Sequence, residues 1–282
     1  MTAHQPDPPA TVDVLGVRFH NVTRQEAAAE IARLAGAGRR GYVVKPYSEF
    51  MPRAASDAGI RSILNEAVLC LPDGIGILWA AHYLSLAGGR WRAIMQLPLS
   101  LGAMMLRPSA IRRPLREAMA GVDLTWRMLS ELETAGASVY LLGGTEQEVS
   151  AASKEIARRL PRLALAGFHH GYLGRSRAAT EAVVEAINAA APDALLVAMG
   201  FPRQERWIAS HLHRLSVNMA VAEGGSFSFI SGSARRAPAW MRQAGLEWLF
   251  RLWRQPSRLR RQLALPAFVW LVLRERLARS GG

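Results

Sequence analysis

Residues 138–160, SVYLLGGTEQEVSAASKEIARRL, decide the fold. A short apolar run ends in two glycines, and apolar residues then recur at the spacing of one helix face: Val149, Ala152, Ile156 and Leu160. This pattern predicts a buried strand, a tight turn at Gly143-Gly144 and an amphipathic helix. The same alternation continues to residue 222. It predicts an α/β fold: a Rossmann-like, mostly parallel sheet with helices on both faces.

Further strands and helices are expected on both sides of this stretch. Strands are predicted at 12–19, 41–46, 67–72, 163–168, 193–199 and 217–222, and helices at 25–34, 54–65, 178–190 and 204–215. In such sheets, ligands bind beyond the carboxyl ends of the strands. The loops that carry function are therefore expected at 72–76, 143–145, 169–172, 200–205 and 223–227.

The positive charge is concentrated in two segments. The 282 residues carry a net charge of +13, of which 88–116 contributes +6 and 235–282 contributes +9. The rest of the chain is nearly neutral, so both segments are expected to meet an anionic partner: a phospholipid surface, a nucleic acid or a phosphate-rich substrate.

The same segments suggest the domain organisation. We expect a disordered tail at 1–11, an α/β domain at 12–245 with a basic apolar insertion at about 88–116, and a basic, helical, amphipathic appendage at 246–282 that associates with a membrane. The apolar runs at 93–106 and 263–273 are shorter than the roughly 20 residues of a membrane span, so they are expected to lie on the bilayer surface. The N-terminus lacks the pattern of a signal peptide, and the single cysteine, Cys70, excludes an internal disulfide, so a cytoplasmic protein is expected.

Asp73 is the candidate general base. It follows a predicted strand in the glycine-flexed loop 72–76 (PDGIG), where a carboxylate can reach a bound hydroxyl. A turn or helix-capping aspartate is the structural alternative. The run GIGILW at 74–79 places Trp79 where a dinucleotide-binding motif needs its third glycine, which argues against a nicotinamide cofactor.

Two other loops carry candidate ligand-binding groups. Backbone N–H groups at Gly143-Gly144 can hold a phosphate or ribose at a helix start. Gln204 and Glu205 are expected to face the cleft from the first turn of a helix, behind the rigid exit of 200–202, although a helix-start charge preference would explain Glu205 as well. The chain has no Asp-x-Asp pair, and the neighbouring His169 and His170 are expected to point to opposite faces of a strand, so no metal site is expected.

Taken together, these motifs resemble the WecG/TagA/CpsF family, glycosyltransferase family 26. The resemblance covers about residues 12–265 and rests on these motifs: 72–76, 120–124 (AGVDL), 140–144 (YLLGG), 170–172 (HGY), 200–207 (GFPRQERW), 224–229 (GGSFSF), 232–241 (GSARRAPAWM) and 245–251 (GLEWLFR). It implies an inverting, metal-independent transferase without a cofactor. The enzyme would move a sugar from a UDP-sugar to a polyprenyl-diphosphate-linked saccharide at the inner face of the membrane, for a surface polymer.

The resemblance also assigns roles to residues. Asp73 would be the catalytic base. The expected donor-binding residues are Lys45, Tyr47, Gly74, Asp123, Gly143, Gly144, Gly200, Pro202, Gln204, Glu205, Gly225, Ser226 and Phe227. The arginines expected at the acceptor diphosphate or the membrane are Arg235, Arg236, Arg251, Arg254, Arg258 and Arg261. Arginine suits this task because it binds pyrophosphate through bidentate hydrogen bonds.

This chain departs from the family pattern at three places. The run 45–49 (KPYSE) replaces the usual Thr-x-Asn before a glutamate, Ala118 replaces an arginine, and Ser228 replaces an aspartate. Lys45 is hypothesised to supply the positive charge of the missing arginine, and a hexose donor is favoured over N-acetylmannosamine. Two alternatives stay open. One is an inactive family member that assists polymer assembly. The other is a nucleic-acid-binding protein, which would have no need of a Rossmann-like core with five polar loops. The sequence does not decide between a monomer and a homo-oligomer.

Overall fold

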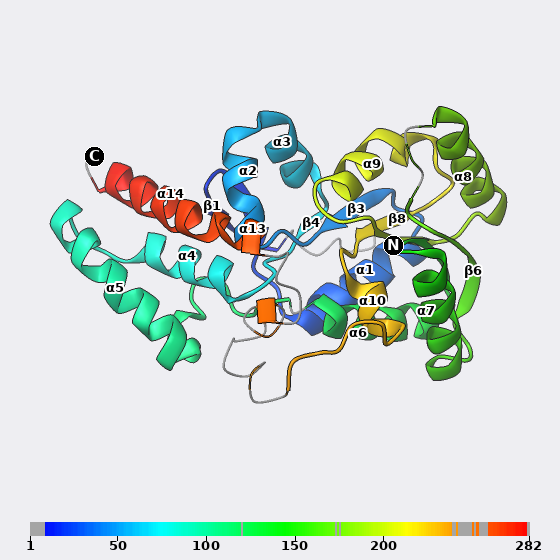
Figure 1. Ribbon diagram of the computed structural model, residues 1–282, viewed down its shortest axis with the longest axis horizontal. Helices are drawn as coiled ribbons and strands as arrows, with labels where there is room; N and C mark the ends of the chain where they lie inside the picture. Colours follow the sequence, from blue (N-terminus) through cyan, green and yellow to red (C-terminus); the bar gives the residue numbers. More distant parts are fainter. Residues whose placement is uncertain are drawn as a thin grey trace, which may run out of the picture.

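The computed structural model describes residues 9–119, 121–172, 174, 176–238, 241, 250, 252–253 and 259–280. Its centre is a parallel six-stranded sheet in the order β4-β3-β8-β7-β5-β6, with helices on both faces (Figure 1). The strands are β3 (Gly41–Val44), β4 (Leu69–Cys70), β5 (Ser138–Gly143), β6 (Ala164–His169), β7 (Ala194–Ala198) and β8 (Met219–Ala222). The predicted α/β fold is confirmed.

Side-chain alternation along the strands divides the core between the two faces of the sheet. Val43 and Leu141 join one buried cluster, whereas the next residues, Val44 and Leu142, join the other. The first cluster includes α1 (Arg24–Gly36), α6 (Gly121–Thr134), α7 (Glu146–Arg159) and α10 (Ser226–Ile230). The second includes α3 (Ala58–Glu66), α4 (Ile75–Ser85), α8 (Arg177–Ala190) and α9 (Arg203–His211). Helices thus cover both faces of the sheet, and the loops that follow the strands lie at the carboxyl ends of the strands.

Local chemistry sets several element boundaries. The predicted helix at 54–65 is two helices, α2 (Met51–Ser56) and α3, because the Asp57 carboxylate accepts a hydrogen bond from the Ile60 N–H (3.1 Å) and starts a new helix. Thr145 and Glu148 form a capping box at the start of α7, directly after the Gly143-Gly144 turn. The predicted N-terminal strand is an antiparallel hairpin of β1 (Thr11–Val14) and β2 (Val17–His20). The described residues also form three short 3₁₀ turns: η1 (Ser48–Phe50), η2 (Pro108–Ile111) and η3 (Leu212–Arg214).

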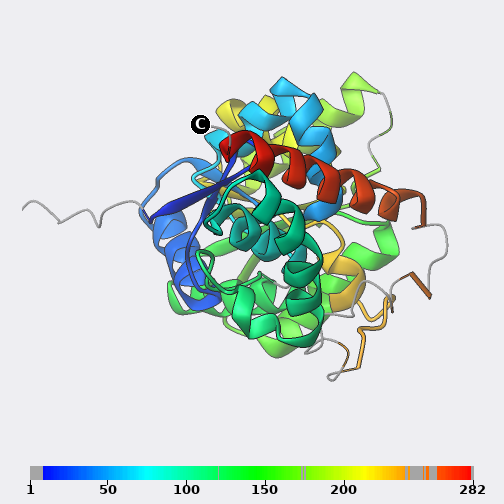
Figure 2. The same cartoon turned by 90° about the vertical axis from the view of Figure 1, so that its left-hand side faces the viewer.

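A helical arm extends from one end of the sheet. It consists of α4, α5 (Arg90–Leu106) and α14 (Ala264–Arg279), which lie side by side at the left of Figure 1 and at the front of Figure 2; the short α13 (Leu259–Gln262) precedes α14. Helix α14 buries Phe268 and Val272 within the arm, and the Phe268 ring meets the ring of Trp79 in α4 edge-on with centroids 6.1 Å apart. Arg276 is buried and donates to the Gly88 carbonyl (3.4 Å). Within the described residues, no helix combines the length and the hydropathy needed to span a membrane.

Candidate active site

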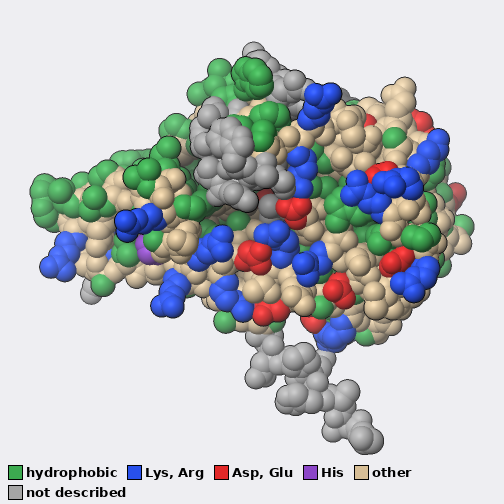
Figure 3. Space-filling view, turned by 90° about the horizontal axis from the view of Figure 1, so that it is seen from below, with side chains coloured by type: hydrophobic (Ala, Val, Ile, Leu, Met, Phe, Trp, Pro, Cys, Tyr) green, Lys and Arg blue, Asp and Glu red, His purple; other side chains and the backbone are tan. Residues whose placement is uncertain are grey.

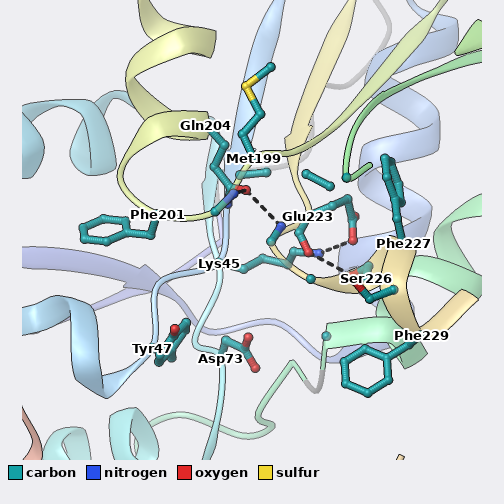
Figure 4. A pocket seen from close by; sticks show the side chains of 18 of the residues that line it. Lys45, Tyr47, Asp73, Met199, Phe201, Gln204, Glu223, Ser226, Phe227 and Phe229 are labelled. Carbon is teal, nitrogen blue, oxygen red and sulfur yellow. Dashed lines mark hydrogen bonds and ion pairs between the residues drawn. The ribbon is translucent and has the colours of Figure 1, made fainter. Parts of the chain in front are cut away.

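A cavity of about 600 Å³ opens at the carboxyl ends of the parallel strands (Figure 4). All five loops predicted from the sequence contribute to its wall. The wall residues that the sequence singled out are Lys45, Tyr47, Asp73, Gly144, Gly200, Gln204, Gly225, Ser226 and Phe227. Further wall residues include Glu49, Phe50, Glu148, Tyr172, Phe201, Glu223, Ser228, Phe229 and Ala264. Gly74, Asp123, Gly143, Pro202, Glu205, Arg235 and Arg236 lie outside this wall.

Asp73 is fixed at the cavity by its main chain. Its N–H donates to the Pro46 carbonyl (3.2 Å), and a parallel bridge pairs it with Tyr47, which places the two side chains near each other in Figure 4. Gly74 follows with φ +81°, a conformation that glycine adopts without strain, and α4 begins directly behind it. Asp73 is partly exposed to the cavity, so its carboxylate is placed to receive a proton from a bound hydroxyl.

Gln204 joins two loops of the cavity. Its Oε1 accepts hydrogen bonds from the Gly200 and Gly224 N–H groups, each at 3.0 Å, and its Nε2 donates to Glu205 Oε1 (2.8 Å). The sequence predicted Gln204 as a donor-binding group. In the structure its amide also holds the loops after β7 and β8 together.

Glu205 is buried behind Gln204. Its Oε2 has no hydrogen-bond partner among the described residues, and burial raises the pKa of its carboxyl to about 7. It faces the protein interior instead of the predicted cleft. Glu205 is therefore placed to orient the Gln204 amide.

Glu205→Gln is expected to make the folding stability less dependent on pH. The folded protein favours the neutral form of the Glu205 carboxyl. This preference stabilises the folded wild type fully at pH values below 4.5, the ordinary pKa of a glutamate, and the stabilisation is lost as the pH rises through about 7. Between pH 4.5 and pH 8 the free energy of unfolding of the wild type should fall by up to about 3 kcal/mol relative to that of the variant. Thermal unfolding midpoints at pH 5 and pH 8 measure this loss. Exposed Glu185→Gln is the control, and a wild-type-to-variant difference that is equal at both pH values would contradict the expectation.

A buried ion pair lies beside the cavity. Lys45 Nζ is 2.9 Å from Glu223 Oε2, and the two side chains are 4% and 0% exposed. The Thr125 hydroxyl donates to the same carboxylate oxygen (2.6 Å) and also lies 3.2 Å from Ser226 Oγ. The ion pair thus joins the end of β3 to the loop after β8 and to α6. No pattern in the sequence indicates this ion pair, because its two partners are far apart in the chain.

Arg236 and Asp123 pair at one margin of the site. The guanidinium donates to both carboxylate oxygens of Asp123, at 2.6 and 2.9 Å, and so holds residues 235–238 beside α6. Arg235 is exposed. Arg251, Arg254 and Arg258 lie outside the described residues, as does the side chain of Arg261.

The two neighbouring histidines lie differently from the sequence expectation. Their ring centroids are 4.4 Å apart, because β6 ends at His169 and the alternation of a strand stops there. Across the described part of the chain, no three His, Cys, Asp or Glu side chains gather as a candidate metal site.

The sequence of the chain is similar to those of known proteins over nearly its whole length. The sequence profile of the "Glycosyl transferase WecG/TagA/CpsF family" matches residues 12–97 and 92–282. Among similar proteins are the enzymes of Staphylococcus aureus strains MW2, NCTC 8325 and COL that are named N-acetylglucosaminyldiphosphoundecaprenol N-acetyl-beta-D-mannosaminyltransferase. Each is 27% identical over 274 residues, which cover 96% of this chain and 96% of the relative.

Proposed function

Because the chain belongs to the WecG/TagA/CpsF family of glycosyltransferases, we propose that it moves a sugar from a UDP-sugar to a saccharide carried on a polyprenyl diphosphate. The observation that carries this proposal is the cavity at the carboxyl ends of the strands, with Asp73 on its wall. The names of the relatives support a lipid-linked saccharide as acceptor.

Asp73 is proposed to act as the general base of an inverting displacement. Its carboxylate takes the proton of the acceptor hydroxyl while that oxygen attacks the anomeric carbon of the donor. The new glycosidic bond forms as the bond from the anomeric carbon to the diphosphate breaks, and UDP leaves with the bonding electrons. Gln204, which fixes the loops around the donor, is proposed to keep the anomeric carbon in line with the attacking oxygen.

The cavity wall is rich in carboxyl groups, so the positive charge that stabilises the diphosphates has to come from elsewhere in the chain. The wall carries the carboxyl groups of Glu49, Asp73, Glu148 and Glu223, whereas Lys45, its one cation within the described residues, already pairs with Glu223. Bound UDP and a lipid diphosphate add more negative charge. We therefore propose that arginines of 235–261 approach the diphosphates and stabilise the leaving group without a metal ion.

A hexose donor is proposed, for a capsule or exopolysaccharide made at the inner face of the bacterial plasma membrane. The staphylococcal relatives are named as N-acetylmannosaminyltransferases. This chain, however, lines its cavity with Lys45 and Tyr47 at the positions of the family's Thr-x-Asn. Two bulky side chains there leave less room for an acetamido group.

Turnover of the purified full-length chain tests the proposal. The donors are UDP-glucose, UDP-galactose and UDP-N-acetylmannosamine, the acceptor is farnesyl-diphosphate-linked N-acetylglucosamine, and the assay measures UDP release. UDP-glucose or UDP-galactose is expected to raise the thermal midpoint and to react, with turnover unchanged by EDTA. Turnover that requires magnesium or manganese would contradict the metal-independent mechanism. Binding of a UDP-sugar without turnover would favour an inactive assembly partner, and tight, salt-sensitive RNA binding without any response to nucleotides would favour the nucleic-acid alternative.

A further inference from the structure

Helix α5 exposes a long apolar face to solvent. Six large side chains share this face, and we call them the α5 stripe: Trp91, Ile94, Met95, Leu99, Met105 and Leu106. Trp91, Leu99 and Leu106 are 74%, 71% and 84% exposed. Figure 3 shows hydrophobic side chains gathered over this end of the molecule. Contiguous apolar patches of this kind mark surfaces that meet a partner or a membrane.

The opposite face of α5 is firmly packed, so the stripe is not a part of the hydrophobic core that has failed to pack. Ala93 is fully buried, and its carbonyl accepts a hydrogen bond from the Tyr83 hydroxyl (2.7 Å). The Trp79 indole N–H donates to the buried Ser100 hydroxyl (3.0 Å), and Leu97 and Leu101 pack on the core. A helix that is apolar on its packed face and on its outer face fits a site between protein and lipid.

The charge around the stripe fits an anionic bilayer. Segment 88–116 holds six arginines and no acidic residue. Arg90 and Arg92 begin α5, Arg107 follows it, and all three are exposed. Arginines beside exposed apolar and tryptophan side chains are typical of surfaces that enter the headgroup region of anionic membranes.

The neighbouring helix extends this surface to the cavity. Helix α14 packs along α5 and exposes Trp270, which is 60% exposed, and Leu263, just before its start, is 67% exposed. The next residue, Ala264, lines the cavity. An apolar path thus runs from the arm to the rim of the site, where a lipid-linked acceptor has to enter.

We propose that the α5 stripe inserts into an anionic bilayer and holds the cavity at the level of the lipid headgroups. The stripe is distinct from the arginine-rich residues 235–261, to which the proposed function assigns the diphosphates. The role of the stripe in catalysis rests on that proposed function, since a cavity held at the headgroups helps the enzyme only if its acceptor is lipid-linked. Binding of the stripe to lipid does not rest on it.

The experiment compares two double variants of the full-length chain in a vesicle sedimentation assay. Met95→Glu/Leu99→Glu places two carboxylates in the stripe, one helical turn apart. Ala178→Glu/Ala182→Glu makes the same charge change one turn apart on exposed positions of α8, far from the arm. The vesicles are phosphatidylcholine with or without 30% phosphatidylglycerol.

The stripe variant is expected to bind the anionic vesicles at least 10-fold more weakly than wild type, and the control within twofold. The wild type is expected to bind phosphatidylcholine vesicles more weakly than the anionic ones. Because the substituted positions are exposed, the thermal midpoint should stay within about 2 °C of wild type. Turnover of the farnesyl-linked acceptor in solution should be unchanged, whereas turnover of an undecaprenyl-linked acceptor in vesicles should fall at least 10-fold.

The outcomes separate the two proposals. Vesicle binding equal to wild type in the stripe variant would overturn the membrane assignment, even if the enzyme turns over as proposed. Loss of a dimer in analytical ultracentrifugation with vesicle binding intact would overturn it in favour of a contact between two copies of the chain. Weaker vesicle binding of the stripe variant, with no turnover by either protein, would support the stripe and contradict the proposed function.

Discussion

Asp73→Asn is expected to lower kcat by about 10²–10⁴-fold while the affinity for the UDP-sugar changes less than threefold. Asparagine keeps the size of the side chain but cannot accept the acceptor's proton. The Asp73 N–H stays bonded to the Pro46 carbonyl, so the loop should keep its position. UDP release under saturating acceptor gives kcat, and calorimetric titration with the UDP-sugar gives the affinity.

The same substitution at a distant aspartate is the matched control. Asp13→Asn lies in the β1–β2 hairpin, away from the cavity, and should leave kcat within twofold of wild type. Normal turnover by Asp73→Asn would remove Asp73 from the mechanism. An equal fall in kcat and in donor affinity would instead assign it a binding role.

Lys45→Met is expected to lower the free energy of unfolding by about 3–5 kcal/mol, because it leaves the Glu223 carboxylate buried without its counter-ion. Among the described side chains, only the Thr125 hydroxyl would then donate to that carboxylate. The double variant Lys45→Met/Glu223→Gln removes both charges and should recover most of the loss. Urea unfolding of the single and double variants measures both effects.

A surface ion pair provides the comparison. Arg214 and Glu181 pair in partly exposed positions, so Arg214→Met should lower the free energy of unfolding far less than Lys45→Met does. If Lys45→Met costs no more than Arg214→Met, the buried ion pair does not stabilise the fold. Comparing the double variant with Glu223→Gln alone isolates the charge of Lys45 in donor binding: equal affinity for the UDP-sugar would end the hypothesis that Lys45 replaces the family's missing arginine.

Local patterns predicted the sheet and the position of the site well. Apolar runs such as 138–142 and 193–199 became β5 and β7, because a short apolar run between turn residues has few other ways to be buried. The rule that ligands lie at the carboxyl ends of parallel strands then placed Asp73 and Gln204 on one cavity.

Features that depend on contacts between distant residues were not predicted. The Lys45–Glu223 ion pair needs β3 and β8 to be neighbours, a pairing that no spacing in the sequence reveals. Ala264 lies at the cavity because α14, which begins with it, packs on distant elements such as α4 and α5. The break at Asp57 was missed for a different reason: an aspartate inside an apolar helical pattern gives no sign of whether it caps a new helix.

The contacts of the last helical turn bear on the order in which the chain is assembled. Arg276 reaches the Gly88 carbonyl, and Arg279 reaches the Asp13 carboxylate (3.3 Å), so the last turn of α14 contacts both the base of the arm and the first hairpin. During translation these partners emerge long before residues 276–279. The sheet can therefore assemble before residues 276–279 are synthesised, whereas the arm is completed only once α14 has joined it. Until then its apolar surface lacks the α14 neighbour, and a nearby bilayer or a chaperone would shield it from aggregation.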